Sequence, residues 1–120
     1  MRFGYTTTQW DQAKVEAQAA MSHAASKRRT ITYTQLTHKI AAIQFDPHDT
    51  ALHWLLGEVT TDEDAQGRGM LSVVVTHKHG DMEPGGGFFQ KAEELGRTVN
   101  DQTTFWVEEL KRVWKHWSTP

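Results

Sequence analysis

The stretch that decides the fold is Met70-Leu71-Ser72-Val73-Val74-Val75-Thr76, a nearly continuous apolar run rich in β-branched residues. Such a run is typical of a strand that is covered on both faces of a sheet. A strand of this kind needs a partner, and the other β-prone segment of the chain is Thr30-Ile31-Thr32-Tyr33. We therefore expect a small sheet built from residues 30–33 and 70–76.

Helical patterns surround both strand segments. Apolar residues recur at helical spacing after the potential N-cap Thr8, and Asp46-Pro47 supplies a cap oxygen followed by a proline suited to a first helical turn. Thr60 and Glu63 stand at capping-box spacing, which predicts a separate acidic turn before Gly67. The predicted helices span residues 9–26, 34–43, 48–59, 88–95 and about 100–117.

Length and composition favour one compact α+β domain over residues 1–120, with about five helices and a small β-sheet. The chain has no cysteine, which excludes disulfides, thiolate catalysis, zinc-finger chemistry and iron–sulfur clusters. No window approaches the roughly 18 apolar residues that span a bilayer, and the N-terminus lacks the apolar core of a secretion signal. A cytoplasmic protein without a membrane partner is the expectation.

The predicted order of elements resembles a winged helix-turn-helix. In that architecture the helix after the turn enters the major groove of DNA, and a hairpin contacts the backbone beside it. Residues 34–43 would form the helix before the turn, and the recognition helix would run from His48 to Val59. Its N-terminal end carries the polar residues that would face bases.

The segment Thr30-Ile31-Thr32-Tyr33-Thr34-Gln35-Leu36 resembles the entry to the helical DNA-binding core of alkylguanine alkyltransferases and alkyltransferase-like proteins. The likeness covers roughly residues 30 to 90 and is one of layout. It implies a winged-helix scaffold with nucleic-acid binding. The Pro-Cys-His-Arg motif of those enzymes does not occur in this chain, so alkyl transfer is excluded.

Charge is unevenly distributed along the chain, although the net charge is only -2. No acidic residue occurs from Ala17 to Phe45, and acids dominate the later part. A basic segment of this kind suits a phosphate backbone, where lysine and arginine displace counterions; self-association or an uneven solvated surface would explain it as well. The residues predicted to contact phosphates are Lys27, Arg28, Arg29, Lys39 and Lys78, and those predicted to face bases are His48 and His53.

A second hypothesis comes from the pair His77 and His79, which alternation places on one face of a strand, with Asp81 close behind. Two imidazoles and a carboxylate suit a divalent transition metal. A small metal-dependent hydrolase or nuclease would then use Glu58 and His77 as catalytic groups. The plainer interpretation is a solvated strand edge, in which case the protein has no catalytic residues and no cofactor.

The C-terminal helix carries an apolar seam of Trp106, Leu110, Val113 and Trp117. Phe105 and Trp114 widen this seam beyond what one core face needs, which favours packing against a second subunit. We expect a homodimer formed through this helix. A protein–protein interaction adaptor that uses the same tryptophans is a third hypothesis.

Overall fold

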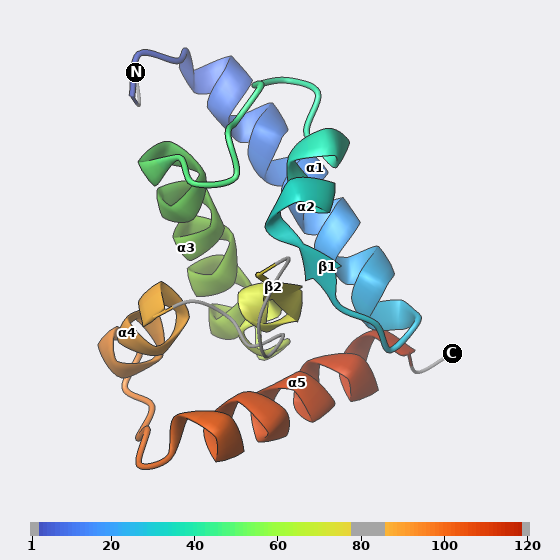
Figure 1. Cartoon of the computed structure of the whole chain (residues 1–120), viewed down its shortest axis with the longest axis vertical. Helices are drawn as coiled ribbons and strands as arrows, with labels where there is room; N and C mark the ends of the chain where they lie inside the picture. Colours follow the sequence, from blue (N-terminus) through green and yellow to red (C-terminus); the bar gives the residue numbers. More distant parts are fainter. Residues whose placement is uncertain (1–2, 78–85, 119–120) are drawn as a thin grey trace.

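Five α-helices and two very short strands make up the described part of the chain, residues 3–77 and 86–118 of the computed structural model (Figure 1). The α+β prediction is confirmed at this level, as a mostly helical domain with a small sheet. Its Cα radius of gyration of 13.5 Å is that of a single compact domain. In chain order the elements are α1 (Thr7–Ser26), β1 (Ile31–Thr32), α2 (Tyr33–Lys39), α3 (Thr50–Ala65), the 3-10 helix η1 (Leu71–Val74), β2 (Val75–Thr76), α4 (Gly86–Glu94) and α5 (Gln102–Ser118).

The two strands pair in parallel, with Ile31 opposite Val75 and Thr32 opposite Thr76. The predicted pairing of these two segments is therefore confirmed, and α2 and α3 form the crossover between them. The hairpin of a winged domain would follow β2, and residues 78–85 of that stretch lie outside the described residues.

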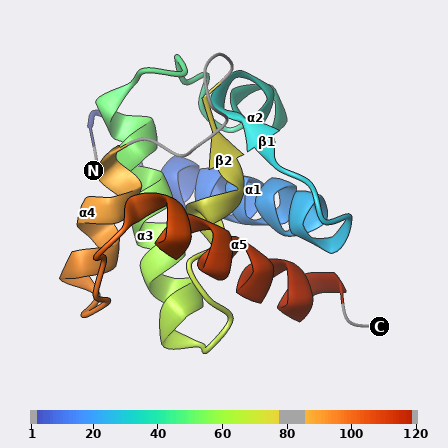
Figure 2. The same ribbon diagram turned by 60° about the horizontal axis from the view of Figure 1, so that its bottom comes forward.

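Most of the predicted strand 70–76 is not a strand, because Leu71–Val74 forms η1. Side chains, in place of a neighbouring strand, accept two backbone N–H groups of this stretch: the Ser72 N–H donates to Thr60 Oγ1 at 3.0 Å, and the Met70 N–H donates to Glu109 Oε2 at 2.8 Å. The apolarity of the run reflects its place at the centre of the molecule, where it contacts α1, α3 and α5 (Figure 2).

Two of the crossover elements differ from their predicted bounds. The helix expected over residues 34–43 ends at Lys39, because Glu16 Oε1 accepts the N–H groups of Ala41 and Ala42 at 3.1 and 2.9 Å and fixes them in a loop. The helix expected at His48 begins at Thr50, after a turn in which Asp46 Oδ1 accepts the His48 N–H. It then continues to Ala65 and absorbs the predicted acidic turn.

Three helices end in the same Schellman motif, which requires one residue in the left-handed backbone region. Gly67 (φ 77°) fills that position after α3, and Gly96 (φ 85°) fills it after α4. After α1 the position is held by Arg28, with φ 54°; its N–H donates to the carbonyl of Ala25, and the Arg29 N–H donates to the carbonyl of Ala24. The basic turn of the sequence is thus a helix end in a conformation that glycine adopts more readily.

Helix α5 packs against the core, and its aromatic residues make contacts within the same chain. Leu110 and Val113 are buried as the seam predicts. The indole N–H of Trp106 donates to the carbonyl of Val73 at 3.2 Å, and that of Trp114 donates to the carbonyl of Arg29 at 3.1 Å. Contacts within the chain therefore account for Trp106 and Trp114 without a second subunit. The homodimer stays a prediction.

The carboxylate of Glu109, 4% exposed, joins α5 to the loop before η1. Besides the Met70 N–H, it accepts a hydrogen bond from Arg97 Nη1 at 2.9 Å, and Arg97 in turn contacts Asp64 of α3. Gly69 (φ 89°) approaches this carboxylate closely: a Cβ added there would lie 3.1 Å from Glu109 Oε2 and 3.0 Å from Val113 Cγ2.

We expect Gly69→Ala to lower the free energy of unfolding by about 2 to 3 kcal/mol, because the new methyl group adds overpacking to an unfavourable backbone conformation. Gly67→Ala is the matched control, since its φ is similar but nothing lies within 4 Å of its added Cβ; it should lose only about 1 kcal/mol. Urea denaturation measures both values. Equal losses would contradict close packing at Gly69.

Candidate nucleic-acid interface

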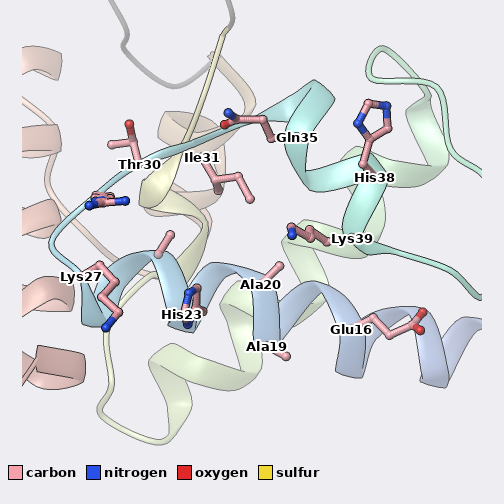
Figure 3. A pocket seen from close by; sticks show the side chains of 12 residues that line it. Glu16, Ala19, Ala20, His23, Lys27, Thr30, Ile31, Gln35, His38 and Lys39 are labelled. Carbon is pink, nitrogen blue, oxygen red and sulfur yellow. The ribbon is translucent and has the colours of Figure 1, made fainter.

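An open groove of about 750 Å³ lies between the C-terminal half of α1 and the β1–α2 segment (Figure 3). We call it the basic groove. Figure 3 shows Lys27 and His23 on α1 at one end, and His38 and Lys39 on α2 at the other. It is lined by Glu16, Ala19, Ala20, His23, Ala24, Lys27, Arg29, Thr30, Ile31, Gln35, His38 and Lys39.

Three of the predicted phosphate-binding residues, Lys27, Arg29 and Lys39, come together in this groove. All three are exposed, and no carboxylate of the described residues pairs with any of them. Glu16 is the one acid in the lining, and its Oε1 accepts two backbone N–H groups. The groove therefore offers positive charge that is available to a ligand.

Small side chains form the floor of the groove. Ala19, Ala20 and Ala24 come from successive turns of α1, and Ile31 closes the other side. Since these side chains are short, a ligand can approach the main chain of α1 while the longer lysine and arginine side chains reach it from the sides. An extended anionic chain suits this shape.

The basic turn at residues 27–29 has a defined geometry. The Schellman motif fixes its backbone to the end of α1, and Trp114 of α5 holds it from the other side through the carbonyl of Arg29. The sequence did not predict that Trp114 contacts this turn, because no local pattern relates the two distant segments. His23 and His38 were recognised as part of the acid-free basic stretch but were not assigned a phosphate contact, and both line the groove.

The predicted base-facing residues lie outside this groove: His53 contacts Tyr33 at the start of α2, and His48 lies in the turn before α3. The ring of Tyr33 lies 5.1 Å from that of His53 of α3 and 5.3 Å from that of His77, which follows β2. Partial burial, with smaller contributions from the charges of His77 and His48, lowers the pKa of His53 below its ordinary value. At pH 7 its imidazole is neutral.

The acidic residues of α3 are engaged within the chain. Glu58, the proposed catalytic acid, accepts a hydrogen bond from Trp10 Nε1 at 3.1 Å and lies 3.5 Å from Lys14 Nζ. Further along the helix, Glu63 pairs with Arg68. These carboxylates hold α3 to α1 and to the following loop.

Two residues of the metal hypothesis and one predicted phosphate contact fall outside the part of the chain that the structure describes. His79 and Asp81 lie outside the described residues, as does the proposed phosphate contact Lys78. In the part of the chain that the structure does describe, no three histidine, aspartate or glutamate side chains form a group that could hold a metal ion. Among these same residues, no helix combines the length and apolarity needed to cross a membrane.

Comparison of the chain with protein-family models, with curated proteins and with solved structures gave no match in any of the three. The function is therefore inferred from the residues and their arrangement alone.

Acidification should destabilise the protein in part through His53. Its pKa is lowered only in the folded state, so between about pH 6.5 and that lower value the unfolded chain binds a proton that the folded chain does not. Stability contributed by neutral His53 is present above pH 6.5 and is lost as the pH falls through this window. We expect His53→Gln to lose less stability than the wild type between pH 7.5 and pH 5.5.

Urea midpoints at pH 7.5, 6.5 and 5.5 give this comparison directly, because the other titrating groups are common to both proteins. His23→Gln is a suitable control, since His23 is exposed on α1. Parallel losses in the wild type and His53→Gln would show that the partial burial of His53 and the nearby His77 and His48 do not disfavour the imidazolium.

Proposed function

We propose that the protein is a small, non-enzymatic nucleic-acid-binding module whose basic groove holds a phosphate backbone. The observation that carries this proposal is the convergence of Lys27 and Arg29, from the turn after α1, and Lys39, from the end of α2, on one exposed groove. Cations spaced along an open groove suit a series of phosphates better than a single small anion. The positive charge is concentrated at the groove, whereas the whole chain carries a net charge of -2.

The conformation of Arg28 supports the same proposal. Where the chain needs a left-handed residue after α3 and α4 it has glycine, and after α1 it has an arginine in a run of three cations. A non-glycine residue in this region costs on the order of 1 kcal/mol. Such a cost is expected where the side chain contributes to function. Arg28 stands between Lys27 and Arg29, which line the basic groove, and a guanidinium is well suited to bind phosphate.

For the scaffold we propose a winged helix-turn-helix. The order of α1, β1, α2, α3 and β2 supports it, as does the likeness of residues 30–36 to the alkyltransferase-like proteins. On this proposal the wing is formed by the residues that follow β2. The phosphate contacts fall mainly on α1 and α2, whereas α3 carries the acids Glu58 and Glu63 that bind other parts of the chain.

The double variant Arg29→Ala and Lys39→Ala should bind nucleic acid roughly tenfold more weakly than the wild type, because charge-assisted contacts to phosphates are lost. The slope of log affinity against log salt should fall by about 0.7 to 0.9 for each contact removed. Fluorescence anisotropy with labelled oligonucleotides at several salt concentrations measures both. Lys111→Ala is the matched control, since Lys111 is exposed on α5 and lies outside the groove lining.

Loss of affinity without a change in salt slope would show that these residues act through structure. An unchanged affinity in the double variant, or an equal loss in Lys111→Ala, would remove the basic groove from the proposal.

Arg28→Gly should separate stability from binding. Glycine relieves the backbone cost at φ 54°, so the free energy of unfolding should rise by up to about 1 kcal/mol, while affinity for nucleic acid falls. Arg28→Ala is the control that removes the same charge and keeps the backbone cost. If Arg28→Gly is more stable and binds as tightly as the wild type, the arginine has no part in binding.

A further inference from the structure

Tyr33, His53 and His77 form a group of planar rings that we call the aromatic platform. The rings come from three segments far apart in the sequence, at the start of α2, on α3 and after β2. Centroid distances of 5.1 and 5.3 Å, with planes tilted by 46° and 40°, place Tyr33 in contact with both imidazoles. Three distant segments thus bring their rings to one place.

The platform differs from the aromatic clusters of the core. Core rings such as Trp10, Phe45 and Phe88 are at most 7% exposed, whereas His53 and His77 are exposed and Tyr33 is half-buried. Apolar burial therefore does not account for the platform. Exposed planar rings are the surfaces on which proteins stack the bases of single-stranded nucleic acids.

The aromatic platform is next to the basic groove along the chain, although its three residues are not part of the groove lining. Tyr33 stands in the chain between Ile31 and Gln35, and both of these residues line the groove. Two residues of chain span at most about 7 Å, so a backbone held in the groove has its neighbouring bases within reach of Tyr33. A groove for phosphates beside rings for bases is the combination found in proteins that bind single strands.

From this arrangement we infer that the natural ligand is single-stranded nucleic acid, with its phosphates in the basic groove and at least one base stacked on the aromatic platform. The inference rests on the proposed function and narrows its substrate class. Bases inside a duplex are already stacked and paired, so their faces are not available to Tyr33. Stacking tolerates any base, and the module would bind with little sequence preference.

The test compares two labelled single strands of equal length, an oligothymidylate and a strand of the same length made of abasic sites. Both carry the same phosphates, and only the first offers bases. The wild type should bind the base-bearing strand at least about fivefold more tightly, which is the lower end of the effect of stacking one base. Tyr33→Leu should bring this ratio close to one and leave affinity for the abasic strand unchanged.

Two further variants keep the result interpretable. Tyr33→Phe retains a ring and should retain most of the preference for bases. Trp54→Leu removes an aromatic side chain of α3 that is 56% exposed and outside the platform, and it should not change the ratio. If Tyr33→Leu fails to fold, His77→Ala makes the same test, because His77 is exposed and follows β2.

The outcomes distinguish the two proposals. Equal binding of the base-bearing and abasic strands by the wild type would overturn the aromatic platform and leave the basic groove intact. Binding to neither strand and to no duplex would overturn the proposed function. Tighter binding to a duplex of the same sequence would overturn the single-strand inference in favour of groove readout by α3.

Discussion

The buried carboxylate of Glu109 is the contact on which the arrangement of the helices most depends. It accepts hydrogen bonds from the Met70 N–H and from Arg97, and Arg97 also contacts Asp64. One side chain of α5 thereby fixes the loop before η1 and, through Arg97, the end of α3. A carboxylate that is 4% exposed is tolerated only because its oxygens are paired in this way, so removing a single partner leaves a buried charge.

The position of α5 then determines the geometry of the basic turn. With the helix anchored by Glu109, Trp114 donates to the carbonyl of Arg29, and Lys27 and Arg29 of that turn line the same groove as Lys39. The acids of α3 are directed elsewhere, since Glu58 contacts Trp10 and Lys14 of α1. The segregation of charge in the sequence is thus accompanied by a separation in space: Glu58 and Glu63 of α3 contact other parts of the chain, whereas Lys27, Arg29 and Lys39 line the basic groove.

The helices were predictable because local spacing and capping residues specify them; α1 and α5 agree with their predicted ranges to within two residues or so. The structure of residues 70–76 was not predictable, since β-branched apolar residues indicate burial as much as a strand. The hydrogen bonds of Ser72 and Met70 to distant side chains favour the 3-10 helix η1 over an extended strand. The cations of the groove were visible in the sequence as an acid-free stretch. Tyr33 was not, because its ring partners His53 and His77 come from distant segments.

The parallel pairing of Ile31 with Val75 has a consequence for how the protein is made. A strand near the N-terminus finds its partner only after α2, α3 and η1 have been synthesised, and contacts this distant in sequence slow folding. Trp114, which holds the other side of the basic turn, leaves the ribosome later still. The nascent chain therefore carries its basic turn for most of its synthesis without Trp114, and the turn gains its contact with α5 only when the last helix docks.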